Sequence, residues 1–246
     1  MTVPICFDMD GVILEGPRTA PQVYDDAADA ALEELGAEPT PAQRRALRSQ
    51  DTEAIRGHCV ELGLDPDRFW TLKERYASAG THERLRSGAR GLYDDIDAVR
   101  TLADRAETPV GLVTNNRHET AAFVADFVDV PFDVVRGRDP TIDGFRRRKP
   151  DPYYLEDALV QLDGTTTIDR VRAGGTGTGT GDGRGEPRGL YVGDSPKDVV
   201  AGTKIGFETA FIRRPHNRDL ECPADATYDL ESLTELLDLE IVEERV

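Results

Sequence analysis

Lysine is scarce in this chain of 246 residues, which has four lysines and 26 arginines. Long apolar runs are also missing. No stretch of about 18 apolar residues occurs, and this excludes a membrane-spanning helix. The chain enters an apolar strand almost at its first residue, so we expect no signal peptide. The missing apolar run and the missing signal peptide together predict a cytoplasmic protein without a membrane partner.

Positive charge is outweighed by negative charge. The chain has 30 Lys and Arg against 47 Asp and Glu, a net charge of -17. This balance argues against a nucleic-acid partner or an acidic membrane surface. The short run Arg146-Arg147-Arg148 leaves only a weak alternative of nucleic-acid binding in so acidic a chain. Acid-rich, lysine-poor surfaces suit concentrated salt, which screens self-repulsion, so we infer a halophilic protein.

Cysteine is also rare, and its spacing excludes the usual metal motifs. Cys6, Cys59 and Cys222 are odd in number, which is typical of buried free thiols in a reducing cytosol. Residues 173–188 hold a Gly/Thr-rich tract that matches no phosphate-loop pattern. Its repeat, residues 174–185, has no apolar residue to offset the entropy of ordering, so we expect a flexible surface insertion.

Helical periodicity is present from residue 20 to about residue 90. Glycine ends two of the expected helices, at Gly36 and Gly63, and two others begin at Thr40 and Asp65, each followed by proline. No strand-like run interrupts this stretch. A block of roughly 70 helical residues directly after a first strand predicts an inserted all-helical cap domain over residues 19–90.

The remainder of the chain alternates strands and helices. Such alternation with short links predicts a parallel sheet in an α/β core, formed by residues 1–18 and 91–246. We expect a closing helix over residues 230–239 and another beginning near residue 92. The expected strands lie at residues 5–7, 109–113, 132–135, 189–192 and 208–212.

Chemically active side chains follow the ends of three of these strands, and Lys149 lies at the start of a helix. Because the carboxyl ends of parallel strands meet at one edge of a sheet, we expect them to converge there. Each has a plainer explanation alone: Thr114 as a helix cap, Lys149 as a solvated charge, Asp198 as a first-turn acid. Lys149 is informative, because arginine replaces lysine almost everywhere else in the chain. The residues are Asp8, Asp10, Thr114, Lys149, Asp194 and Asp198.

Taken together, four motifs resemble those of the haloacid dehalogenase-like superfamily. The resemblance covers the whole chain except the Gly/Thr tract. The helical insert is similar to the first cap type, found in phosphoglycolate-phosphatase-like members. The resemblance implies a Rossmann-like core. The motifs are Phe7-Asp8-Met9-Asp10-Gly11, Leu112-Val113-Thr114-Asn115, Lys149-Pro150-Asp151-Pro152 and Gly193-Asp194-Ser195-Pro196-Lys197-Asp198.

The resemblance also implies a role for each residue. Asp8 would be the nucleophile and Asp10 the general acid and base. Thr114, Asn115 and Lys149 would bind the phosphoryl group. Asp8, Asp194 and the backbone carbonyl of Asp10 would bind Mg²⁺, with Asp198 supporting them from behind.

The chemistry of a phosphomonoester agrees with these roles. The ester carries about two negative charges, so a carboxylate nucleophile needs a divalent cation to neutralise part of them. Dehalogenases of the superfamily have no acid at the second position, because halide leaves unprotonated. Asp10 therefore favours phosphate chemistry.

The sequence predicts a magnesium-dependent phosphatase acting on a small phosphorylated metabolite, with phosphoglycolate as the leading candidate by resemblance. A phosphomutase with the same core is the nearest alternative. A binding protein with a relict site is the alternative from another class. The substrate, the cap residues that select it and the oligomeric state do not follow from the sequence.

Overall fold

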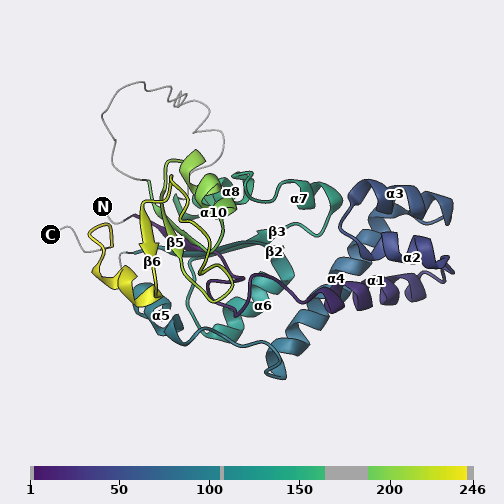
Figure 1. The fold of residues 1–246 in the computed structure, drawn as a ribbon, viewed down its shortest axis with the longest axis horizontal. Coiled ribbons are helices and arrows are strands. Elements are labelled where there is room, and N and C mark those ends of the chain that lie inside the picture. Colours follow the sequence, from purple (N-terminus) through teal and green to yellow (C-terminus); the bar gives the residue numbers. More distant parts are fainter. Residues whose placement is uncertain (1–2, 106–107, 164–187, 243–246) are drawn as a thin grey trace.

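The computed structural model describes residues 3–105, 108–163 and 188–242. Its centre is a sheet of six strands in the order β3-β2-β1-β4-β5-β6, with every neighbouring pair parallel (Figure 1). This is the strand order of Rossmann folds, so the predicted Rossmann-like core is confirmed. The strands are β1 (Ile5–Phe7), β2 (Val110–Arg117), β3 (Val134–Arg138), β4 (Leu190–Gly193), β5 (Glu208–Ile212) and β6 (Tyr228–Leu230).

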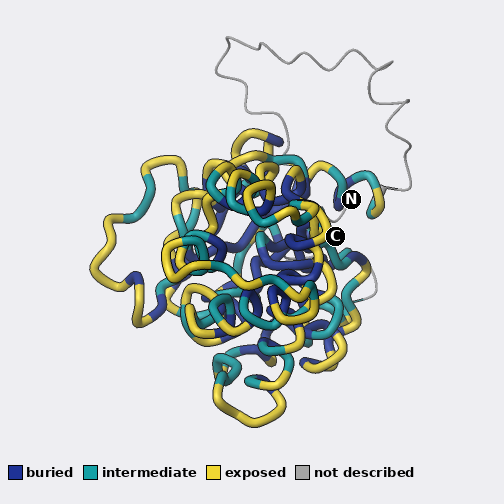
Figure 2. The backbone as a smooth tube through the Cα atoms, turned by 90° about the vertical axis from the view of Figure 1, so that its right-hand side faces the viewer, coloured by how far each residue is buried: buried dark blue, intermediate teal, exposed yellow. Residues whose placement is uncertain are grey.

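Helices cover both faces of this sheet. Ile5 and Phe7 pack into one apolar cluster together with α5 and α6, whereas Cys6 packs into the other with α8 and α10. This alternation is expected of a strand that is buried on both faces. Figure 2 shows the buried backbone gathered in the middle of the molecule. The helical elements of the core are η1 (Asp94–Ile96), α5 (Asp97–Ala103), α6 (His118–Val128), α7 (Ile142–Arg146), α8 (Tyr153–Asp163), α10 (Pro196–Lys204) and η2 (Leu233–Asp238).

Four helices between β1 and η1 form a lobe beside the sheet (Figure 1). Their starts follow the predicted signals: Thr40 forms a capping box with Gln43, and Asp65 accepts hydrogen bonds from two backbone amides of the following turn. The lobe has an apolar cluster around Trp70. The assignment of residues 19–90 to a separate cap domain stays a prediction. The helices are α1 (Pro21–Glu34), α2 (Pro41–Arg48), α3 (Thr52–Glu61) and α4 (Pro66–Arg86).

The short helix α7 was not predicted, and it joins the two parts of the molecule. It leaves the end of β3 and lies between the sheet and the helical lobe (Figure 1). Ile142 and Phe145 of α7 are buried in the apolar cluster of the lobe, and the Phe145 ring meets Trp70 edge to face at 5.0 Å. The lobe therefore packs on a segment of the core.

Three predicted elements are corrected by the structure. The closing helix expected over residues 230–239 is wrong at its start, because Leu230 pairs with Ile212 as the last residue of β6. Up to residue 242, where the described chain ends, the short 3₁₀ helix η2 follows, from a capping box at Ser232. The helix expected from Leu92 begins later, because Leu92 forms an antiparallel bridge with Leu14. The strand expected at residues 132–135 lies further on, at β3.

The other predictions on composition have mixed outcomes. Cys6 and Cys59 are buried free thiols as predicted, whereas Cys222 is partly exposed. No helix within the described residues is long and apolar enough to cross a membrane. The Gly/Thr tract predicted to be a flexible insertion, residues 173–188, lies outside the described residues except for Arg188.

Candidate active site

The sheet brings the predicted side chains to one edge. Asp8 follows β1 and Asp194 follows β4, and these strands are neighbours in which the Asp8 amide donates to the Val192 carbonyl at 2.9 Å. Asp8, Asp10, Thr114, Asn115, Asp194 and Asp198 line one cavity of about 350 Å³. The convergence expected at the carboxyl edge of the sheet is therefore observed.

Lys149 lies behind this cavity, almost fully buried, and bridges two of the carboxylates. Its Nζ is 3.0 Å from Asp8 Oδ1 and 2.7 Å from Asp198 Oδ1. It also donates to the Tyr191 hydroxyl at 2.5 Å, and that hydroxyl donates to the Val113 carbonyl at 2.7 Å. Burial lowers the pKa of Lys149, but the two carboxylates outweigh burial, so its pKa is raised and it stays charged.

Asn115 holds the backbone of Lys149. Its side-chain Nδ2 donates to the Lys149 carbonyl at 3.2 Å, and its Oδ1 accepts from the Lys149 amide at 2.7 Å. Both ends of the amide are thereby used to position the lysine. The predicted contact of Asn115 with substrate stays a prediction, as does that of Thr114, which is buried in the wall of the same cavity.

Three carboxylates meet where a metal was expected. One oxygen each from Asp8, Asp194 and Asp198 lies within 4.8 Å of the others. Burial raises the pKa of Asp8 to about 7; the nearby carboxylates push it the same way and Lys149 opposes them. One ammonium group therefore does not compensate the negative charge of this cluster. Buried carboxylate oxygens with excess negative charge fit Mg²⁺, a hard cation that prefers oxygen ligands.

Asp10 and Asp198 differ in their relation to this group of three carboxylates. The Asp10 carboxylate is not in this group, so any part of Asp10 in metal binding falls to its backbone carbonyl, as the resemblance implies. Asp198, expected behind the ligands, is a member of the group. Its second oxygen accepts from the amide and the hydroxyl of Ser195, which fixes the side chain at the start of α10.

Asp194 has partners that the sequence reading missed. His216 Nε2 lies 2.6 Å from Asp194 Oδ2, and Asn217 donates to the Asp194 carbonyl at 2.8 Å. Burial raises the pKa of Asp194 and the His216 hydrogen bond opposes this effect. The sequence held one signal for this contact, because His216 is one of only four histidines in the chain and lies shortly after an expected strand.

Gly11 is required by this arrangement. Its φ is 79°, and a Cβ atom at this position would lie 1.9 Å from Asp194 Oδ2. Glycine both adopts this conformation and leaves room for the carboxylate. The turn after β1 therefore depends on a residue without a side chain.

Asp10 is held by two residues that the sequence reading also missed. Arg90 Nη1 lies 2.7 Å from Asp10 Oδ1, and Asn116 donates to Asp10 Oδ2 at 2.8 Å. Arg90 also donates to the carbonyls of Glu15 and Gly16, on the segment that leads into the helical lobe. The predicted acid–base residue is thus fixed by the segment through which the chain returns from the lobe.

Comparisons with known proteins agree with this arrangement. A model of the haloacid dehalogenase-like hydrolase family matches residues 5–206. No curated protein matches the chain. The structure is similar to CbbY from Rhodobacter sphaeroides in complex with phosphate, at 20% identity and a TM-score of 0.58, covering 97% of this chain and 100% of that one.

Two further structures show the same fold. A putative β-phosphoglucomutase from Thermotoga maritima is 18% identical, covering 96% of this chain and 97% of that one at a TM-score of 0.51. A putative phosphoglycolate phosphatase from Lactobacillus plantarum is 19% identical, covering 97% and 99% at a TM-score of 0.50. Since the family model spans most of the sequence, including the strands that carry Asp8, Thr114 and Asp194, the chain belongs to the haloacid dehalogenase-like hydrolase family.

Proposed function

We propose that the protein is a magnesium-dependent phosphatase that hydrolyses small phosphomonoesters through an aspartyl-phosphate on Asp8. The observation that carries the proposal is the cluster of Asp8, Asp194 and Asp198 around the Lys149 ammonium. It combines a nucleophile, oxygen ligands for a cation and a fixed positive charge at one edge of the sheet. These are the parts that phosphoryl transfer requires.

The side chains divide the reaction between them. The Asp8 carboxylate attacks phosphorus, and the bond to the leaving alkoxide breaks. Asp10 gives its proton to that alkoxide and then takes a proton from the water that attacks the acyl phosphate, which releases phosphate and restores Asp8. Lys149 and the Thr114 hydroxyl stabilise charge on the phosphoryl oxygens. When bound by Asp8, Asp194 and the Asp10 carbonyl, Mg²⁺ supplies the positive charge that lets two anions approach.

The helical lobe closes one side of the proposed site. Tyr24 of α1 and Gln50, which follows α2, line the same cavity as Asp8. A site covered in this way admits small molecules and excludes water during the reaction. We therefore expect turnover of small metabolites and none of folded phosphoproteins.

The stereochemical course at phosphorus tests the covalent route. A substrate whose phosphoryl group is chiral through oxygen isotopes should give phosphate with retained configuration, because two in-line displacements each invert it. Acid quenching should also leave a phosphoryl group on Asp8, detectable in the peptide by mass spectrometry, with Asp8→Asn as the control. Inversion at phosphorus would mean that water attacks directly, and the nucleophile assignment would be wrong.

A phosphomutase is the second candidate, because a putative β-phosphoglucomutase is among the similar structures. A mutase returns the phosphoryl group to a sugar, whereas a phosphatase releases it. A screen of phosphoglycolate, sugar phosphates, nucleotides and polyol phosphates with Mg²⁺, at low and molar salt, separates the two. Free phosphate is the expected product, and isomerised sugar phosphate without phosphate release would favour the mutase.

A further inference from the structure

The cavity of the proposed active site has a second, basic group of residues in its wall. Arg138 at the end of β3 and Arg148 before Lys149 line it, together with the Phe145 ring. Neither arginine belongs to the motifs that indicate phosphate chemistry. Both come from the core of the protein, beside the helix that packs on the lobe.

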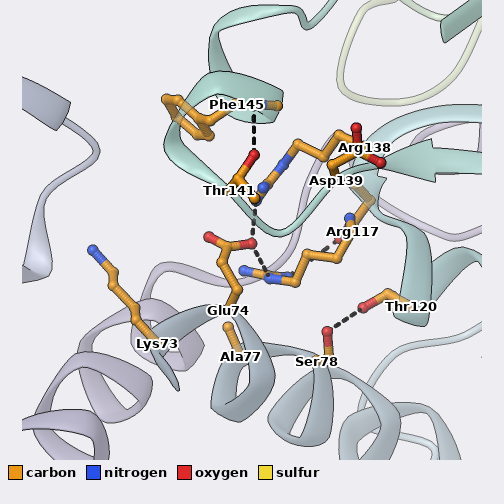
Figure 3. Close-up of polar contacts among 12 residues, drawn as sticks. Lys73, Glu74, Ala77, Ser78, Arg117, Thr120, Arg138, Asp139, Thr141 and Phe145 are labelled. Atoms are coloured by element: carbon orange, nitrogen blue, oxygen red, sulfur yellow. Dashed lines mark hydrogen bonds and ion pairs between the residues drawn. The ribbon is translucent and has the colours of Figure 1, made fainter. Parts of the chain in front are cut away.

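Arg138 and Arg117 share one carboxylate. Glu74 of α4 extends from the lobe, and its Oε2 is 2.5 Å from Arg138 Nη2 and 2.9 Å from Arg117 Nε (Figure 3). All three side chains are at most 4% exposed. Lys73, next along the helix, points away and donates to the carbonyls of Leu47 and Ser49.

Arg138 keeps one donor free. Its Nη1 is buried and has no hydrogen-bond partner among the described residues. A buried guanidinium nitrogen without an acceptor costs free energy, and a bound anion would offset that cost.

Arg148 adds a second positive charge beside Arg138. Its guanidinium lies 3.3 Å from the centre of the Phe145 ring and donates from Nε to the Phe145 carbonyl at 2.7 Å. Within residues 3–105, 108–163 and 188–242 it forms no ion pair with a carboxylate. Burial lowers the pKa of Arg148 to about 10, and repulsion from Arg138 adds to this effect. Arg117 and Arg138 both use the Glu74 carboxylate, so Arg148 is left without a carboxylate partner among the described residues.

An excess of buried positive charge is unusual in a protein of net charge -17. The ion pairs of Glu74 with Arg117 and Arg138 join the lobe to the core, which accounts for those two arginines structurally. This role does not account for Arg148. The planar fork of a guanidinium fits the two oxygens of a carboxylate or phosphate.

We propose that the cavity binds phosphomonoesters that carry a second anionic group, a carboxylate or a phosphate, and that Arg148 and Arg138 recognise this group. The inference rests on the proposed phosphatase function of the same site. A cavity of about 350 Å³ suits such a small molecule. The reacting phosphoryl group lies at the carboxylate cluster and the second anion at the arginines.

Three esters of similar size test this recognition. They are 2-phosphoglycolate, ethylene glycol bisphosphate and 2-hydroxyethyl phosphate, whose second end is an uncharged hydroxyl. A hydrogen bond to a charged group changes an affinity by about 10- to 100-fold. The kcat/KM of the wild type should therefore be higher for an anionic ester by such a factor. The better of the two anionic esters shows whether carboxylate or phosphate is recognised.

Arg148→Gln should remove most of this preference, and Arg148→Lys should keep part of it. The matched control is Arg147→Gln, because Arg147 is exposed, stacks on Tyr153 and lies outside the cavity wall. The control should keep the wild-type preference. A wild type without preference for an anionic ester would overturn the proposal, as would an Arg148→Gln variant whose kcat/KM falls equally for all three esters.

Binding to Asp8→Asn separates this inference from the proposed function. If no ester is hydrolysed, calorimetry with 2-phosphoglycolate and 2-hydroxyethyl phosphate still measures the preference. Tighter binding of phosphoglycolate that is lost on adding Arg148→Gln would support the anion site while the phosphatase proposal failed. Equal binding of both esters would overturn the anion site.

Discussion

The two parts of the cavity wall carry opposite excess charge. At the sheet edge, Lys149 bridges two of three buried carboxylates. Towards the lobe, Arg117 and Arg138 share Glu74, and Arg148 has no carboxylate partner among the described residues. Neither part balances its own charge, and a buried charge without a partner costs free energy. The acidic part fits a divalent cation and the basic part an anion. This difference is the reason why we propose that a strongly acidic protein holds an anionic substrate.

Replacing Asp8 should have the largest effect, because it removes the proposed nucleophile from the acidic part. We expect Asp8→Asn to lower phosphate release by about 10⁴-fold or more, as an amide cannot form the acyl phosphate. Stopped and continuous phosphate assays measure this loss, and thermal unfolding checks that the variant is folded. A variant that keeps more than a tenth of wild-type turnover would contradict the role of Asp8.

Replacing Asp10 should have a smaller effect on the same part. Asp10→Asn removes the proposed general acid and base, and such catalysis is worth about 10²–10⁴ in rate. Because the Asp10 carboxylate lies outside the carboxylate group, we expect Mg²⁺ affinity to change little. Calorimetry of Mg²⁺ binding beside the turnover assay tests both statements. Loss of Mg²⁺ binding together with turnover would instead indicate that the Asp10 side chain binds the metal.

Breaking the basic part should affect stability. Glu74→Gln leaves the guanidinium groups of Arg117 and Arg138 without their carboxylate, and removal of one partner of a buried ion pair costs about 3–5 kcal/mol. Chemical unfolding measures the change. The control is Glu83→Gln on the same helix, where an exposed side chain should change stability by less than about 0.5 kcal/mol. Equal effects of the two substitutions would mean that the shared carboxylate is not important for stability.

The smallest expected effect concerns the acidic part of the cavity wall and is a change of stability with pH. The pKa of Asp8 in the folded protein is raised to about 7 by burial, from an ordinary value of 3.8. The folded state therefore binds more protons than the unfolded state between these values. The contribution of Asp8 to stability is fully present below pH 4 and is lost as the pH rises through 7.

In metal-free buffer, Asp8→Asn should therefore be more stable than the wild type at pH 8. The advantage should shrink as the pH falls towards 4, because the wild-type carboxyl is then protonated. Thermal unfolding of both proteins at steps of pH measures the difference. An advantage that is constant across this range would show that the Asp8 charge is not the cause.

Local signals in the sequence predicted much of the fold and the acidic part of the site. The capping box at Thr40 and the N-cap at Asp65 act within three residues, so the sequence alone was sufficient to place them. The aspartates after β1 and β4 were found because parallel strands end at a common edge. The closing helix was wrong because Leu230 is apolar in either a strand or a helix, and only pairing with Ile212 selects the strand.

The partners of these residues were decided by the tertiary structure. Arg90 meets Asp10 across 80 positions of sequence, and Arg138 meets Glu74 across 64. Such contacts depend on which strands become neighbours and on where the helical lobe packs, and no local pattern encodes that choice. The sequence by itself therefore determined the family, the α/β core and the residues at the strand ends. Only the folded chain decided which buried charges face each other, because electrostatic pairing requires proximity in space.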